Sequence, residues 1–219
     1  LLDNVIGKAT VPFSAKPYLK KSFAQQGEDL ILDRVFSGIL QKDLSQSHTY
    51  VDVGAYDPIK HSVTYLLYLR GWNGIVFDPS IETARLFKRW RKRDKVINAV
   101  VGETDGIDVD FFVKRSGAIT QVGDQSPQGT KYPTTYRKPE EMINFEKFTF
   151  RQVNLNDELK RQGINKIDFL NMDVEGAELE ILRTFDFEYF KPSIIAVEIL
   201  SNNLAKCLES EQAKIILKQ

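Results

Sequence analysis

The sequence predicts an α/β fold in which helices cover both faces of a mostly parallel sheet. Apolar segments of strand length alternate with segments of helical periodicity along most of the chain. The strand segments are apolar almost throughout, which is typical of strands buried on both faces of a sheet. Several of them end in a glycine or a carboxylate, and ligands of such folds bind beyond the carboxyl ends of the strands.

The predicted elements follow one another in a regular order. Strands are expected at 49–55, 74–77, 95–101, 107–113, 148–153 (a sheet edge), 167–172 and 193–199. Helices are expected at 22–40, 61–70, 81–93, 157–162 and 176–185, with one more at the carboxyl terminus. Gly71 and Gly163 follow two of these helices directly, in the position where glycine favours a helix end.

Apolar periodicity assigns an inward face to two of these helices. In the helix over 22–40 that face consists of Leu30, Ile31, Val35, Ile39 and Leu40. In the helix over 81–93, opposite a basic face, it consists of Ile81, Ala84 and Phe87.

Composition limits the classes of protein that fit. The 219 residues suit one ordinary domain, for which we expect an arm over 1–21 and a single domain over 22–219. Thirty basic residues balance thirty acidic ones, so net charge gives no general attraction to nucleic acid or an anionic membrane. The single cysteine excludes an intrachain disulfide and fits a reducing compartment, so we expect a cytoplasmic protein. No apolar stretch reaches the roughly 20 residues of a membrane span.

Residues 114–145 interrupt the alternation of strands and helices. They combine glycines and prolines with polar side chains and show no regular periodicity. A segment of this length without regular structure is unusual inside a compact domain and often has a function. We expect a lid or substrate loop here, because loops supply specificity in such folds.

The first candidate site follows the strand over 49–55. Gly54 would let the chain turn and let a ligand approach closely. The loop lacks the three-glycine pattern that seats a pyrophosphate, and Asp52 and Asp57 would repel one. These carboxylates suit a ligand with a cationic amine or a sulfonium. The alternative is a tight turn whose acids bind no ligand.

Two further strand ends carry acids. Asp78 ends the next strand, roughly 20 residues after Gly54, where an acid typically accepts hydrogen bonds from ribose hydroxyls. Gly54 and Asp78 together favour an adenosine-containing ligand without a pyrophosphate. Asp173 ends a later strand, where it can face the same ligand. Glu175 and Glu178 come at the start of the following helix, where the helix dipole favours acids.

Four segments together resemble the FkbM-type methyltransferases, S-adenosylmethionine-dependent enzymes with a Rossmann-like, class I fold. The segments are AQQGEDL (24–30), VDVGAYDP with SVTY (51–65), GWNGI with the following acid (71–78), and a DVEGAE block (167–182). Ala24 replaces the serine of the family's S-Q-x-G-E-D-L segment, and Val63 replaces the asparagine of its S-N-T-Y segment. The order and spacing of all four segments, rather than any one of them, are specific for the family.

The resemblance implies transfer of a methyl group from S-adenosylmethionine to a hydroxyl of a sugar, a glycan or another natural product. Residues 22–219 would then form the methyltransferase domain. The implied cofactor-binding residues are Asp52, Gly54, Ala55, Tyr56, Ser62, Asp78, Pro79, Val101, Gly102 and Asp173. The implied acceptor-binding residues are Gln25, Glu28 and His61.

Methyl transfer from a sulfonium is an in-line displacement, so the protein mainly has to align the acceptor oxygen, the methyl carbon and the sulfur. Because a sugar hydroxyl is a weak nucleophile, a nearby base helps. Asp173 is the first choice as this base, followed by Glu175 and Glu198. The same three carboxylates could instead hold a divalent cation, which we do not favour.

Other classes of function have some support. The basic run over 88–93 contains Trp90 and could indicate a nucleic-acid-binding methyltransferase, although a solvated helix face explains it better. A non-catalytic binding module with a decayed donor site is a second alternative. The chain ends soon after the strand over 193–199, so we also expect an open sheet edge through which two chains could pair.

Overall fold

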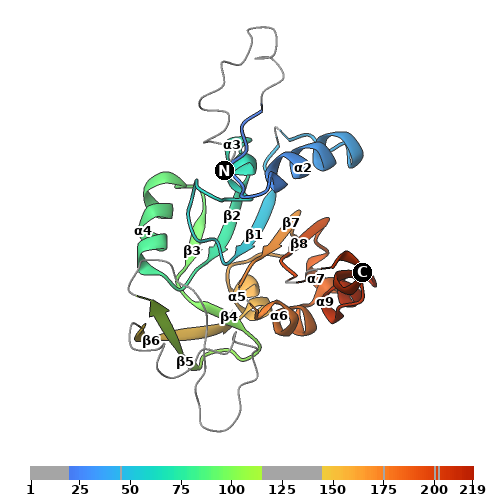
Figure 1. Cartoon of the computed structure of the whole chain (residues 1–219). Coiled ribbons are helices and arrows are strands. Elements are labelled where there is room, and N and C mark those ends of the chain that lie inside the picture. Colours follow the sequence, from blue (N-terminus) through green and yellow to red (C-terminus); the bar gives the residue numbers. More distant parts are fainter. Residues whose placement is uncertain (1–19, 45, 115–144, 175, 200, 202) are drawn as a thin grey trace, which may run out of the picture.

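The computed structural model describes residues 20–44, 46–114, 145–174, 176–199, 201 and 203–219. Its centre is a five-stranded, entirely parallel sheet with the order β3-β2-β1-β7-β8 (Figure 1). The strands are β1 (Thr49–Val53), β2 (Asn73–Phe77), β3 (Lys95–Ile97), β7 (Phe169–Met172) and β8 (Ile194–Val197). The strand order reverses between β1 and β7, and the predicted α/β fold with a parallel sheet is confirmed.

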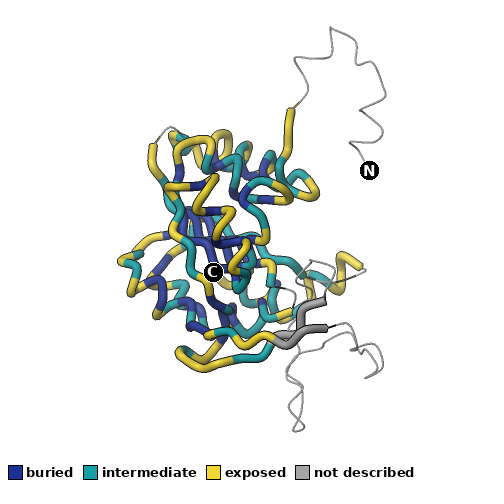
Figure 2. Tube along the Cα trace, turned by 90° about the vertical axis from the view of Figure 1, so that its left-hand side faces the viewer, coloured by how far each residue is buried: buried dark blue, intermediate teal, exposed yellow. Residues whose placement is uncertain are grey.

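Helices pack on both faces of this sheet. The described helices are α2 (Glu28–Arg34), η2 (Val35–Ile39, a π-helix), α3 (Tyr65–Leu69), α4 (Ile81–Trp90), α5 (Leu155–Arg161), α6 (Glu178–Thr184), α7 (Phe187–Phe190), α8 (Leu204–Leu208) and α9 (Glu211–Ile216). Side chains of β1 alternate between the faces. Val51 and Val53 join a core with α5, α6 and α7, and Tyr50 joins a core with α2, η2, α3 and α4. Figure 2 shows these buried residues gathered in the middle of the molecule.

A second, three-stranded sheet has the order β4-β6-β5, with β4 (Val100–Gly102), β5 (Asp108–Lys114) and β6 (Phe145–Asn154). The strand predicted at 107–113 is confirmed as β5. The single strand predicted at 95–101 is wrong, because the chain leaves the large sheet at Asn98, whose side-chain amide donates to the Asp78 carbonyl (2.9 Å). The edge position predicted for 148–153 is also wrong, because β6 pairs with β4 on one side and β5 on the other.

The inward face predicted for residues 22–40 is wrong. Ile31 and Ile39 are 63% and 69% exposed, whereas Leu32 and Phe36 are buried. The α-helix begins only at Glu28, after Gly27 in the left-handed region, and continues as a π-helix from Val35. The wider turn changes which side chains face the sheet after Val35, whereas Ile31 and Leu32 lie in the preceding α-helix.

The prediction for residues 81–93 is right for Ala84 and Phe87, which are buried, and wrong for Ile81, which is 54% exposed. Helix α4 ends at Trp90. Arg91 then leaves the helical path and is fully buried, so the run over 88–93 is not a uniformly solvated face.

The carboxyl-terminal helix is divided into α8 and α9, because Ser210 caps a new helix by accepting from the Ala213 amide. Most of the expected arm (1–21) and nearly all of the expected lid (114–145) lie outside the described residues, so these two expectations stay predictions. Within the described part of the chain, no helix has the length and apolar character needed to cross a membrane.

Candidate functional site

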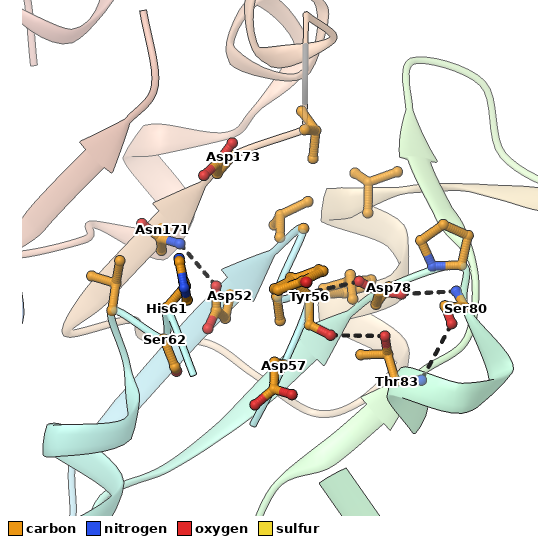
Figure 3. A pocket seen from close by; sticks show the side chains of 18 of the residues that line it. Asp52, Tyr56, Asp57, His61, Ser62, Asp78, Ser80, Thr83, Asn171 and Asp173 are labelled. Atoms are coloured by element: carbon orange, nitrogen blue, oxygen red, sulfur yellow. Dashed lines mark hydrogen bonds between the residues drawn. The ribbon is translucent and has the colours of Figure 1, made fainter. Parts of the chain in front are cut away.

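A cavity of about 580 Å³ lies beyond the carboxyl ends of β1, β2 and β7, near the point where the strand order reverses (Figure 3). Both its position and its size are typical of small-molecule sites in parallel α/β sheets. The sequence-predicted site residues that line it are Gln25, Asp52, Gly54, Ala55, Tyr56, His61, Ser62, Asp78, Pro79, Val101 and Asp173. Further lining residues include Lys60, Phe77, Ser80, Thr83, Leu86, Ala99 and Asn171.

Asp78 is fixed at the end of β2 by two backbone amides. Its carboxylate accepts from the Tyr56 amide (3.0 Å) and the Ser80 amide (2.8 Å), as Figure 3 shows. Only 6% of Asp78 is exposed. Burial raises the pKa of Asp78 to about 6, although the two amides act in the opposite direction. Asp78 is therefore a buried carboxylate with a raised pKa that lines the cavity.

The loop after β1 holds two non-glycine residues in the left-handed region, Tyr56 (φ 53°) and His61 (φ 59°). The Tyr56 carbonyl accepts from the Thr83 hydroxyl (2.9 Å), which ties the loop to α4. The rings of Tyr56 and His61 meet edge to face, and the His61 imidazole lies 3.5 Å from the Gln25 side-chain oxygen. Left-handed backbone conformations of non-glycine residues cost free energy, and they are concentrated at ligand sites.

Asp52 lies on the floor of the cavity. It is 2% exposed, and each of its carboxylate oxygens has a partner. The Thr64 hydroxyl donates to one oxygen (2.6 Å) and the Asn171 amide donates to the other (2.9 Å). Asp52 and Asn171 are direct neighbours in the β1–β7 register, so strand pairing brings them together.

The turn predicted at Gly54 is confirmed, and the structure adds a second reason for a glycine at this position. Gly54 has φ 86°, and a Cβ there would lie 1.8 Å from the backbone carbonyl oxygen of Asp173. The end of a neighbouring strand thus comes close to Gly54, which also lines the cavity. The glycine permits the tight approach of β1 and β7 that brings Asp173 to the cavity.

Two predicted binding residues do not line the cavity. A Cβ on Gly102 would meet the side-chain amide of Gln152 at 2.5 Å, so Gly102 makes room for that side chain. The Glu28 carboxylate accepts from the Gln26 amide (2.8 Å) and stabilises the turn that leads into α2. Both residues thus have local structural roles.

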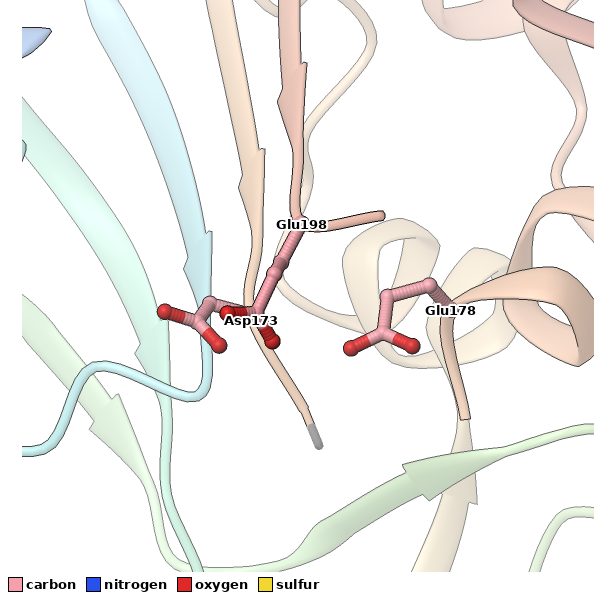
Figure 4. Close-up of side chains that lie close together, drawn as sticks. All are labelled: Asp173, Glu178 and Glu198. Carbon is pink, nitrogen blue, oxygen red and sulfur yellow. The ribbon is translucent and has the colours of Figure 1, made fainter. Parts of the chain in front are cut away.

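Three acids converge beside the cavity (Figure 4). Oxygens of Asp173, Glu178 and Glu198 all lie within 4.8 Å of one another. The trio expected from the sequence contained Glu175, which is outside the described residues, in place of Glu178. The Glu178 carboxylate accepts from the Val174 amide (2.9 Å) and from the Gly176 amide (3.0 Å), so it stabilises the start of α6 without an ion.

The parallel sheet with this strand order defines a Rossmann-like α/β fold with a cavity beyond its carboxyl edge. The family model of the methyltransferase FkbM domain matches residues 52–215. The chain therefore belongs to the FkbM family of S-adenosylmethionine-dependent methyltransferases, and the resemblance seen in its sequence is confirmed.

Among solved structures, the chain is similar to the crystal structure of methyltransferase FkbM from Methylobacillus flagellatus KT. The two share 17% sequence identity with a TM-score of 0.40, over 69% of this chain and 32% of that one. The chain thus spans about a third of the length of that protein. A comparison with curated proteins finds no significant match.

Proposed function

We propose that the cavity binds S-adenosylmethionine and that the chain transfers its methyl group to a hydroxyl of a sugar, a glycan or another natural product. The observation that carries this proposal is Asp78, a carboxylate held in place at the end of β2 and lining the cavity. Such an acid is suited to accept hydrogen bonds from both ribose hydroxyls of the donor.

The rest of the cavity suits the other parts of the donor. The apolar side chains of Pro79, Leu86 and Val101 line the part expected to hold the adenine. The carboxylate of Asp52, on the cavity floor, suits the ammonium group of the methionine part.

Asp173 is our proposed base. It lines the cavity at the end of β7, while Gln25 and His61 line the region where we expect the acceptor to enter. In the transfer, the acceptor oxygen forms a bond to the methyl carbon while the carbon–sulfur bond breaks. The sulfur keeps the electron pair, giving S-adenosylhomocysteine, and the hydroxyl proton passes to Asp173. Glu198 and Glu175 remain the alternative bases.

Calorimetric titration with S-adenosylhomocysteine tests the donor site. We expect micromolar binding by the parent chain and at least tenfold weaker binding by Asp78→Asn, because hydrogen bonds to a charged group contribute about 1.5–3 kcal/mol each. Asp157→Asn, at an exposed position on α5, is the matched control and is expected to bind like the parent. A folded parent chain that binds no S-adenosylhomocysteine would contradict the proposal.

Transfer itself is tested with S-adenosylmethionine carrying a radiolabelled methyl group and a panel of monosaccharides and glycans. We expect label in a base-stable ether of one of these acceptors, and at least tenfold less with Asp78→Asn when the donor concentration is well below its dissociation constant. Label that appears only in carboxyl esters or amines would exclude a hydroxyl acceptor.

A further inference from the structure

Arg91 is a fully buried guanidinium between the end of α4 and the floor of the cavity. A guanidinium has five N–H groups and accepts no hydrogen bond. Its partners are Asp94 (2.6 Å), the Pro58 carbonyl (3.3 Å) and the hydroxyls of Ser62 (3.1 Å), Tyr50 (2.6 Å) and Thr64 (3.0 Å). These bonds satisfy the whole hydrogen-bonding capacity of the buried cation.

The Nε of Arg91, which faces Asp94, helps to hold α4 against the sheet. Asp94 pairs with this Nε and also accepts from the Tyr50 hydroxyl (2.5 Å) and the Gly74 amide (3.0 Å). Burial alone would lower the pKa of Arg91, but Tyr50, Asp94 and Asp52 outweigh that effect and raise it. The cation thus keeps its charge and joins α4 to β1 and β2.

The Nη2 of Arg91 is connected to the cavity through Thr64 and Asp52. The Thr64 hydroxyl accepts from Arg91 Nη2, and because arginine accepts no hydrogen bond, the hydroxyl proton is available for Asp52. Asp52 Oδ2 accepts that proton at 2.6 Å. Thr64 is completely buried. Its hydroxyl accepts from the cation and donates to the carboxylate, and the Ser62 hydroxyl lies 3.4 Å away.

We propose that Arg91 and Thr64 are positioning residues for the methyl donor. Through the Thr64 hydroxyl, the buried guanidinium holds the Asp52 carboxylate in place and directed at the ammonium group of S-adenosylmethionine. This inference rests on the proposed function, because it assigns Asp52 to the methionine part of the donor. The adenosine part is assigned to Asp78, whose hydrogen bonds come from the Tyr56 and Ser80 amides instead.

The molecule offers a matched pair of variants. Thr64→Val and Tyr50→Phe each remove one buried hydroxyl that accepts from the same nitrogen, Nη2 of Arg91. Both leave a side chain of nearly the same shape. Only Thr64 stands between the guanidinium and Asp52, whereas Tyr50 connects it to Asp94.

Binding of two ligands distinguishes an effect on the position of Asp52 from a general loss of protein stability. S-adenosylhomocysteine carries the amino-acid part, and 5′-methylthioadenosine has the same thioether-linked adenosine without it. For Thr64→Val we expect about tenfold weaker binding of S-adenosylhomocysteine, the usual cost of losing a hydrogen bond to a charged group. Binding of 5′-methylthioadenosine should stay within about twofold of the parent. For Tyr50→Phe, we expect a lower melting temperature and unchanged affinity for both ligands.

The outcomes are distinct. Equal losses for both ligands in Thr64→Val, equal losses of S-adenosylhomocysteine affinity in the two variants, or full affinity in Thr64→Val would each overturn the inference. Thr64→Ser keeps the hydroxyl and should restore the affinity. If Thr64→Val does not fold, Thr64→Cys, with a weaker donor of similar size, is measured in its place with the same criteria. A parent chain that binds neither ligand would instead refute the proposed function.

Discussion

At the scale of single residues, the cavity depends on carboxylates that the protein keeps buried and hydrogen-bonded. Asp52 and Asp78 are 2% and 6% exposed, yet each has two hydrogen-bond donors. Burying a charge without partners costs free energy, and these hydrogen bonds offset that cost. The two carboxylates can therefore stay at the cavity as hydrogen-bond acceptors for a ligand. The two acids are also close enough for the charge of Asp52 to add to the rise in the pKa of Asp78.

The raised pKa of Asp78 predicts a pH dependence of donor binding. Because burial raises this pKa to about 6, the carboxylate gains a proton in the free protein as the pH falls through that value. The protonated form loses an acceptor for the ribose hydroxyls, so S-adenosylhomocysteine should bind about tenfold more weakly at pH 5 than at pH 8. Calorimetric titrations across this range measure the effect.

Asp78→Asn is the control for this pH dependence, because other titrating groups are common to both proteins. We expect a flatter profile for the variant between pH 5 and 8. A profile as steep as that of the parent would assign the effect to another group.

At the scale of elements, the close approach of β1 and β7 sets the position of Asp173. Gly54→Ala would place a Cβ 1.8 Å from the Asp173 carbonyl oxygen, in addition to a left-handed φ of 86°. At Gly163, which ends α5, φ is 74° but a Cβ would meet nothing within 4 Å. Gly163→Ala should therefore cost only the conformational penalty of about 1–2 kcal/mol.

We expect Gly54→Ala to lower the free energy of unfolding by clearly more than Gly163→Ala, since strands must also move apart. It should also weaken S-adenosylhomocysteine binding, while Gly163→Ala should leave it unchanged. Urea denaturation of the two variants gives the comparison. Equal losses of stability would mean that the backbone at residue 54 relaxes freely.

How far the sequence predicts the site depends on what each residue type reveals. Acids at strand ends, such as Asp78, are visible in the sequence because the carboxyl ends of parallel strands meet at one edge. The roles of Thr64 and Arg91 are not visible, because they arise only when α3 and α4 pack over β1. Periodicity treats every arginine of a basic run alike, and so it missed the one that turns inward.

At the scale of the whole molecule, the burial of Arg91 weakens the case for nucleic acid as a partner of the basic run over 88–93. Within the run, Arg91 is buried, and the Arg93 guanidinium lies 3.9 Å from the centre of the Tyr68 ring. The exposed cations left in the run are fewer than its sequence indicates, and the net charge of the chain is zero. Because few phosphate contacts give weak binding, this surface should not hold nucleic acid at physiological salt.

Chromatography on heparin and titration with labelled single-stranded DNA test this expectation. We expect elution from heparin below roughly 0.2 M salt and no saturable DNA binding, because affinity falls steeply with salt when contacts are electrostatic. Lys88→Glu and Lys92→Glu, both at exposed positions of the run, should leave the elution nearly unchanged. Retention to higher salt that these substitutions abolish would show that the run does bind a polyanion, and a nucleic-acid acceptor would then replace the sugar or glycan as the substrate to test.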